Sequence, residues 1–321
     1  MDRLIEAIEA AQNPSVVGLD PTPALVPPQV IDSYADEVET QVEDPSELRA
    51  TQLSVAYFAY NCAIIDAIAD IVPAVKPQIA MYEALGPAGI DAYTMTCEYA
   101  QQQGLYVIGD TKRGDIGSTA TAYAAHLSGV PTPREEPHDP WHEDAITINP
   151  YLGADGITPF TDAAKTTDKD LFTLVRTSNP SSAEIQELAL ADGTRLYERV
   201  GALVEEWGAD SLGRFGYSRV GAVVGATHPE EGAALRTAMP HTFFLVPGYG
   251  AQGGTAQSVA GMFDRDGSGA IVNSSRGIIG AWRSSDAYSE TMGADDALAL
   301  VADCARQAAL DMRDQLRVAL P

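Results

Sequence analysis

The densest group of charged side chains in the sequence follows a short apolar run, residues 106–108. Asp110, Lys112 and Asp115 lie within the seven residues that come next. On an extended segment Asp110 and Lys112 point to the same side, because side chains two residues apart in a strand share a face. An ammonium group held between carboxylates stays charged and can be directed as a proton donor. A structural salt bridge at a strand end would produce the same pattern, so other residues must decide between the two.

A second lysine, Lys76, interrupts the apolar segment Val75-Lys76-Pro77-Gln78-Ile79. The chain has only four lysines, and the other two, Lys165 and Lys169, lie in a polar stretch typical of a surface loop. Where lysine is this scarce, a lysine in an apolar setting indicates a functional role. We therefore expect Lys76 to act with Lys112.

A glycine-rich segment, residues 246–255, precedes a further apolar run that ends at Arg276. Glycines let backbone N–H groups approach an anion closely, and an arginine at the next strand end can bind it through two hydrogen bonds. The segment and Arg276 together predict a phosphate site. A tight turn followed by a structural arginine is the alternative.

Two other features are weaker. The acidic, proline-interrupted run 134–144 contains His138 and His142, but it lacks the helical spacing of a zinc protease, and we expect a solvated loop without metal. Ser178 could be a nucleophile, but no histidine has an evident partner position, so we expect it to bind ligand.

These residues follow apolar runs that alternate with helical patterns along the chain. The runs are continuously apolar, as in parallel strands that are covered on both faces. A single (β/α)8 barrel domain over 1–321 is the predicted fold, with surface insertions near 34–45 and 131–144. A doubly wound sheet is the alternative, but no Gly-x-Gly-x-x-Gly follows the first strand. The predicted strands are Ser15–Asp20, Ala74–Gln78, Leu105–Asp110, Ala145–Asn149, Leu171–Thr177, Arg219–Ala226, Thr242–Pro247 and Ala270–Ser274.

The composition narrows the range of partners. With 45 acidic and 20 basic residues the formal charge is −25, which argues against nucleic acid and anionic membranes. No apolar run reaches the roughly 18 residues of a membrane helix, and the N-terminal segment is not a signal peptide. Acidic excess with few lysines is typical of proteins from extreme halophiles, and an acidic mesophilic protein is the alternative. The three cysteines are widely spaced, which favours a reducing cytoplasm.

Taken together, the motifs resemble the orotidine 5′-phosphate decarboxylase family, and its longer branch in particular. The resemblance runs from about Val16 to Ile279, and its motifs follow the family order at successive strand ends. They are Val-Gly-Leu-Asp20, Val-Lys76-Pro-Gln, the segment from Asp110 to Thr119, Pro247-Gly-Tyr-Gly-Ala-Gln252-Gly-Gly and Ser275-Arg276-Gly.

The resemblance implies a homodimer that converts orotidine 5′-monophosphate to UMP and CO2 without metal or organic cofactor. It assigns to Lys112 the proton donated to C6 of the pyrimidine. Asp110 and Lys76 complete the charged network at the carboxylate that is lost. Asp115 and Thr119 reach into the partner subunit's site.

The resemblance also implies a set of substrate-binding residues. Asp20 and Lys76 contact the ribose hydroxyls, Ser178 the amide edge of the pyrimidine, and Gln252 and Arg276 the phosphate. Loss of CO2 leaves a carbanion at C6 in the plane of the ring, and a fixed cation at that point stabilises it. The binding energy of the remote phosphate can be used at the reacting end.

Two other functions share these features. Related Mg²⁺-dependent sugar-phosphate enzymes, such as hexulose-phosphate synthases, have a similar Asp-x-Lys-x-x-Asp barrel, and they use acidic residues at strand ends as metal ligands. The Lys-Pro-Gln and Gly-Ala-Gln-Gly-Gly segments favour the decarboxylase. A non-catalytic binding protein on the same barrel is the third interpretation, and the presence of every expected charged residue argues against it.

Overall fold

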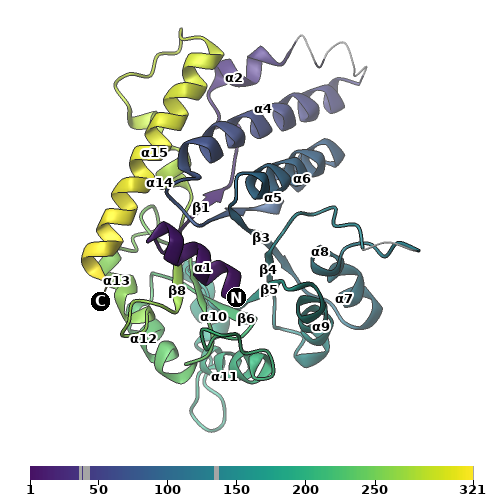
Figure 1. Cartoon of the computed structure of the whole chain (residues 1–321), viewed down its shortest axis with the longest axis vertical. Helices are drawn as coiled ribbons and strands as arrows, with labels where there is room; N and C mark the ends of the chain where they lie inside the picture. Colours follow the sequence, from purple (N-terminus) through teal and green to yellow (C-terminus); the bar gives the residue numbers. More distant parts are fainter. Residues whose placement is uncertain (36–37, 39–43, 134–136, 321) are drawn as a thin grey trace.

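The computed structural model describes residues 1–35, 38, 44–133 and 137–320. Within these residues, parallel strands pair in chain order and close into a barrel, with β8 beside β1 (Figure 1). This confirms the predicted (β/α)8 fold, and the doubly wound sheet is wrong. The strands are β1 (Ser15–Leu19), β2 (Ala74–Pro77), β3 (Tyr106–Arg113), β4 (Ala145–Ile148), β5 (Asp170–Arg176), β6 (Val220–Val224), β7 (Phe244–Val246) and β8 (Ala270–Ser274).

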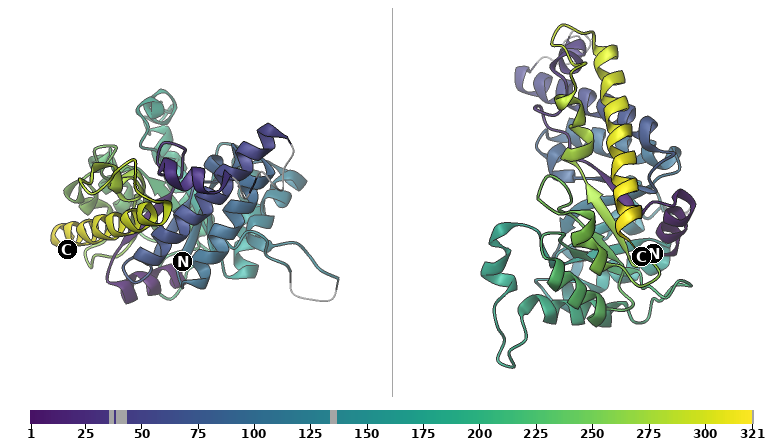
Figure 2. Two further views of the ribbon diagram at one scale, coloured as in Figure 1. Left: turned by 90° about the horizontal axis from the view of Figure 1, so that it is seen from above. Right: turned by 90° about the vertical axis from the view of Figure 1, so that its left-hand side faces the viewer.

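Helices follow each strand and cover the outside of the barrel, and α15 is the longest of those described (Figures 1 and 2). None of the described helices is long and apolar enough to cross a membrane. The helices are α1 (Asp2–Ala11), α2 (Pro28–Ser33), α4 (Pro45–Ile68), α5 (Ile79–Glu83), α6 (Pro87–Gln102), α7 (Gly117–Tyr123), α8 (Ala125–Ser128), α9 (Thr158–Thr167), α10 (Ala183–Gln186), α11 (Leu196–Gly208), α12 (Pro229–Ala238), α13 (Ala256–Val259), α14 (Arg276–Ile279) and α15 (Ala294–Ala319).

The strands are continuously apolar because both of their faces are buried. One face packs against the helices, and the other contributes to a cluster inside the barrel. Phe172 of β5 and Phe243, next to β7, are large members of the inner cluster, and Leu4 and Ile5 of α1 join it. The inner cluster holds the strands in place, so that the residues at their carboxyl ends have fixed positions.

The predicted strands agree with the observed ones to within a few residues, with one informative exception. β3 does not end at Asp110 but continues to Arg113, and its pairing with β4 shifts in register between Gly109 and Arg113. Asp110 and Lys112 therefore lie inside an irregular part of a strand, where the simple alternation of faces does not apply.

The two predicted insertions have different outcomes. The first lies between α2 and α4, and its residues 36–37 and 39–43 are outside the described part of the chain. The second leaves the barrel beyond Val130, which forms an antiparallel bridge with His138 (Figure 2).

The end of the second insertion was expected to be a solvated loop, and this expectation is wrong. Trp141 stacks on His126, with ring centroids 4.0 Å apart. Glu143 is buried, accepts a hydrogen bond from Tyr93 and lies 2.8 Å from Nδ1 of His126. The carboxylate occupies space that Gly109 leaves free, because a Cβ at Gly109 would stand 2.1 Å from Glu143 Oε1. The acidic residue is buried because it has polar partners there.

Candidate active site

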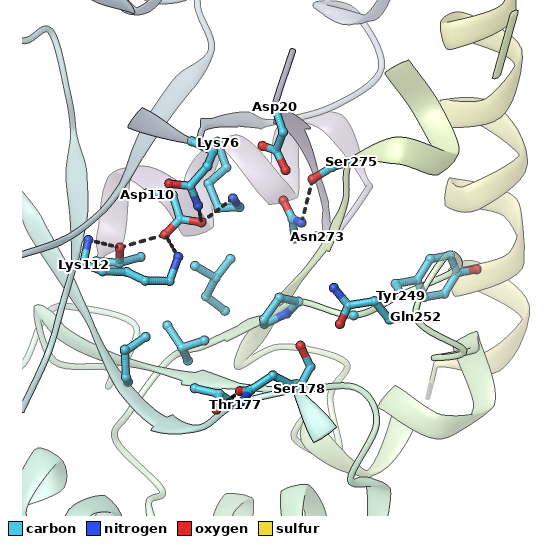
Figure 3. Close-up of a pocket in the computed structure, with 18 of the residues that line it drawn as sticks. Asp20, Lys76, Asp110, Lys112, Thr177, Ser178, Tyr249, Gln252, Asn273 and Ser275 are labelled. Atoms are coloured by element: carbon cyan, nitrogen blue, oxygen red, sulfur yellow. Dashed lines mark hydrogen bonds and ion pairs between the residues drawn. The ribbon is translucent and has the colours of Figure 1, made fainter. Parts of the chain in front are cut away.

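A cavity of about 500 Å³ opens at the carboxyl ends of the strands, where barrel enzymes have their active sites (Figure 3). Most of the predicted site residues line it together: Asp20, Lys76, Asp110, Lys112, Ser178, Gln252 and Arg276. They come from the ends of six segments that are far apart in the sequence, with Asp110 and Lys112 on the same one, and the closed barrel brings them to one mouth.

Asp110 is the centre of the polar network in this cavity (Figure 3). Its Oδ1 accepts hydrogen bonds from Lys112 Nζ at 2.5 Å and from Thr147 Oγ1 at 2.9 Å. Its Oδ2 accepts from Lys76 Nζ at 2.7 Å and from Gln78 Nε2 at 2.9 Å. A carboxylate has about four lone-pair positions. The four donors fill them, so Asp110 is held rigidly.

The charges of the network stabilise one another. Burial by itself would raise the pKa of Asp110, but Lys76 and Lys112 hold that pKa well below its usual range. Burial would likewise lower the pKa of Lys76, but Asp110 and then Asp20 raise it above 10.5. Asp110 and Lys76 are therefore both charged at neutral pH. The Lys112 side chain is 47% exposed, which leaves its ammonium accessible from the cavity.

The expectation that Asp110 and Lys112 lie on an extended segment is wrong in detail. Lys112 has φ +46°, in the left-handed region that non-glycine residues seldom adopt. Its side chain nevertheless turns toward Asp110, as the sequence predicted.

The opposite side of the cavity is polar but less buried. Ser178 follows β5, and Gln252 lies in the loop after β7. Gly248, with φ +99°, separates them: a Cβ there would stand 3.2 Å from Ser178 Cβ and 3.3 Å from Gln252 Oε1. Arg276 is the first residue of α14, is exposed and faces the same cavity.

Two predicted site residues, Asp115 and Thr119, do not line the cavity of their own chain. The Asp115 carboxylate accepts a hydrogen bond from the N–H of Ile116, and no described side chain caps α7. Asp115 therefore does not act as a cap of this helix.

Sequence reasoning did not assign roles to Gln78, Thr147 and Asn273, which also line the cavity. Gln78 was visible in the Lys-Pro-Gln motif, but nothing in the sequence marks Thr147 or Asn273, since both lie inside strands. Within the described residues, Oδ1 of Asn273 and Oδ1 of Asp20 are buried without a hydrogen-bond partner. Both are therefore acceptors available to ligand hydroxyl or N–H groups.

A further residue without a predicted role, Arg176, lies behind the cavity wall at the end of β5 and is fully buried. Its guanidinium contacts the carboxylates of Glu187 and Glu231, each at 2.5 Å. It also contacts Gln186, whose Oε1 accepts the N–H of Thr177 at 3.0 Å. Arg176 thus supports the segment that carries Ser178.

The described residues contain no group of three or more His, Cys, Asp or Glu side chains arranged to hold a metal ion. His138 pairs through its backbone with Val130. The backbone N–H of His142 donates to Asp139.

The comparisons with known proteins agree with this geometry. Residues 16–290 match the model of the orotidine 5′-phosphate decarboxylase / HUMPS family. The chain belongs to this family. It is 42% identical over 316 residues to the orotidine 5′-phosphate decarboxylase of Rhodopirellula baltica, covering 98% of each chain. The relative of the same name from Clostridium acetobutylicum is 38% identical over 321 residues and is covered to 99%. Orotidine 5′-phosphate decarboxylase is a carboxy-lyase, so membership and relatives together indicate an enzyme.

Solved structures place this family member on the same barrel. The Leishmania donovani OMP decarboxylase superposes with a TM-score of 0.70 at 27% identity, over 99% of this chain and 97% of that one. The Plasmodium berghei orotidine 5′-monophosphate decarboxylase, at 17% identity and a TM-score of 0.73, shares the fold over 99% and 97% of the two chains.

Proposed function

We propose that the chain is an orotidine 5′-phosphate decarboxylase that acts by electrostatic catalysis, with Lys112 as the proton donor. The observation that carries the proposal is the Lys76–Asp110–Lys112 network, in which one saturated carboxylate fixes two ammonium groups at the cavity wall. The cavity volume of about 500 Å³ suits a nucleotide.

In the proposed reaction the bond between C6 and the carboxylate carbon breaks, CO2 leaves, and the electron pair stays on C6. The Lys112 ammonium stabilises this charge and then donates its proton to C6, which gives UMP. Asp110 holds Lys112 in place and lies beside the substrate carboxylate, which disfavours the ground state. The rate gain from ground-state destabilisation is contested, whereas the fixed cation acts on the transition state itself.

The remaining cavity residues fit the rest of the nucleotide. The free acceptor on Asp20 suits a ribose hydroxyl, and Lys76 lies beside it. Ser178 faces the position proposed for the amide edge of the pyrimidine. Gln252 and Arg276, at the ends of the last two strands, suit the phosphate dianion.

The donor set argues for the decarboxylase over a Mg²⁺-dependent synthase. A hard cation needs carboxylate oxygens with free lone pairs. The four hydrogen bonds to Asp110 leave it none, so metal binding would require the network to open.

The test is an absorbance assay with orotidine 5′-monophosphate, run with and without EDTA in molar KCl and at low salt. The proposal expects turnover that EDTA does not change. Activity that EDTA abolishes would favour the synthase class, and cavity binding without turnover would favour a non-catalytic barrel. The salt series also tests the predicted halophilic origin, which would give higher activity in KCl. The cytoplasmic location stays a prediction.

We also propose that the active form is a homodimer with shared sites. Apolar side chains close to Asp115 are exposed, with Ile116 54% and Leu152 48% accessible, which is unusual unless another surface covers them. Asp115 and Thr119 lie outside their own cavity, so a second copy is needed to bring them to a site.

Mixing two inactive variants tests the shared site. In the proposed dimer each site takes Lys112 from one chain and Asp115 from the other. When a Lys112→Ala chain pairs with an Asp115→Ala chain, one site therefore lacks both residues and the other site has both. Random exchange of equal amounts makes half the dimers mixed, so about a quarter of wild-type activity returns if sites are independent. No recovery after confirmed subunit exchange would show that Asp115 acts within its own chain.

A further inference from the structure

The irregular part of β3 is organised around a single residue of the neighbouring strand. Gly109 pairs with Ile146 and Arg113 pairs with Ile148, so the three residues between them on β3 face only Thr147 on β4. Bulges of this kind redirect side chains near active sites. Here the redirected residues include Asp110 and Lys112.

Thr147 makes a hydrogen bond to each of the three bulged residues. Its hydroxyl oxygen accepts the backbone N–H of Lys112 at 2.9 Å, and the hydroxyl proton goes to Oδ1 of Asp110 at 2.9 Å. Its carbonyl accepts the hydroxyl of Thr111 at 3.1 Å. Thr147 is only 1% exposed, so water cannot readily replace these bonds.

The bond to the Lys112 N–H is the one that matters for the backbone. A left-handed conformation is unfavourable for a non-glycine residue and persists only where its surroundings impose it. At Lys112 the φ is +46°, and the N–H of this residue donates to the Thr147 hydroxyl, which anchors the peptide that leads into the left-handed turn. The same hydroxyl holds the carboxylate to which the Lys112 ammonium is paired.

We propose that Thr147 is a positioning residue: its hydroxyl fixes the left-handed backbone of Lys112 and the Asp110 carboxylate, and so sets where the ammonium lies. The proposal rests on the proposed function, because the ammonium it positions is the proposed proton donor. Valine has the shape of threonine without the hydroxyl. Thr147→Val therefore removes both bonds and leaves the packing of β4 almost unchanged.

The chain offers a matched control in Thr173 of β5. Thr173 is also fully buried, on the strand next to Thr147, and pairs with Ile148. Its hydroxyl has no hydrogen-bond partner among the described residues. Thr173→Val thus makes the same chemical change where no hydrogen bond is lost, and Thr147→Ser keeps the hydroxyl in place.

Steady-state kinetics with orotidine 5′-monophosphate give the first readout. We expect Thr147→Val to lower kcat by about 10- to 100-fold, the effect of a displaced reacting group, with KM changed less than about threefold. Thr147→Ser and Thr173→Val should stay within about threefold of wild type. A kcat for Thr147→Val within that range, or an equal loss in Thr173→Val, would overturn the proposal.

The second readout does not depend on turnover. Because the chain has four lysines, ¹⁵N-lysine labelling gives four backbone amide signals, of which Lys112 is one. In Thr147→Val the Lys112 signal should shift and its amide should exchange at least about tenfold faster, as expected when a buried hydrogen bond is lost. An unchanged Lys112 signal would overturn the proposal even if kcat fell. If wild type shows no decarboxylation, the proposed function fails, while the amide data still decide whether Thr147 holds Lys112.

Discussion

Arg176→Met should destabilise the protein strongly, although Arg176 does not itself line the cavity. Methionine keeps the length of the side chain and removes the guanidinium. The change leaves Glu187 and Glu231 without the cation with which both form ion pairs. It also removes the donor to Ser182 at 2.8 Å.

The expected cost follows from how far each partner is buried. Removing one member of a buried ion pair typically costs about 3–5 kcal/mol, because the other charge is left uncompensated. Arg176 is 0% exposed, but Glu187 and Glu231 are 41% and 31% exposed and can regain water. We therefore expect Arg176→Met to lower the free energy of unfolding by about 3 kcal/mol, the lower end of this range.

Urea unfolding of wild type and Arg176→Met measures this cost, and Arg306→Met is the control variant. Arg306 also contacts a carboxylate through two nitrogens, at 2.5 and 2.8 Å from the oxygens of Asp70, but both side chains are exposed. Exposed pairs contribute roughly 0–1 kcal/mol. Equal midpoints for the two variants at unchanged m would refute the argument from burial. Because Gln186 links Arg176 to Thr177, we also expect a higher KM for the nucleotide in Arg176→Met alone.

Three further outcomes are expected. Gly225→Ala places a methyl group 2.8 Å from the backbone N of Ser178, so Ser178 must move by roughly half an ångström, and KM should rise about tenfold. Gly293→Ala is the control: the nearest atom to its new methyl group is 3.8 Å away, so KM should not change. Arg276→Ala should weaken binding of UMP by about 10- to 100-fold and leave the affinity for uridine unchanged, which titration of each ligand measures. An equal loss of affinity for both ligands would show that Arg276 has a structural role. The lowered pKa of Asp110 adds stability that is present above the unfolded pKa of about 4 and is lost as pH falls below that value. In Asp110→Asn the urea midpoint should therefore fall less between pH 5 and 3 than in wild type. Parallel plots of urea midpoint against pH for the two proteins would contradict this.

The barrel was predictable because its strands are buried on both faces, which leaves a continuous apolar signal at each of them. The charged end of β3 was not predictable as a strand. Lys112 continues the strand only with a left-handed backbone, and that conformation depends on a hydroxyl from β4. No pattern within residues 106–113 contains this information.

The site was predictable where a residue type was unusual for its surroundings, as for Lys76 in an apolar run. Thr147 and Arg176 escaped notice because threonine is common in strands and arginine is common at strand ends. Glu143 was misjudged for the opposite reason. It stands in an acidic run that suggests solvent, and its partners Tyr93 and His126 come from helices elsewhere in the sequence.

The bridge between Val130 and His138 has a consequence for engineering. Two backbone hydrogen bonds, at 2.7 and 3.0 Å, join the chain at the two ends of this loop, well before Trp141 and Glu143 enter the core. Loop-closure entropy changes slowly with length, so a loop closed at its base tolerates exchange for one of another size. The segment between Val130 and His138 is therefore a natural graft point for a peptide tag or a binding epitope. A graft that ran on to residue 143 would instead remove the carboxylate that packs behind the active-site strand.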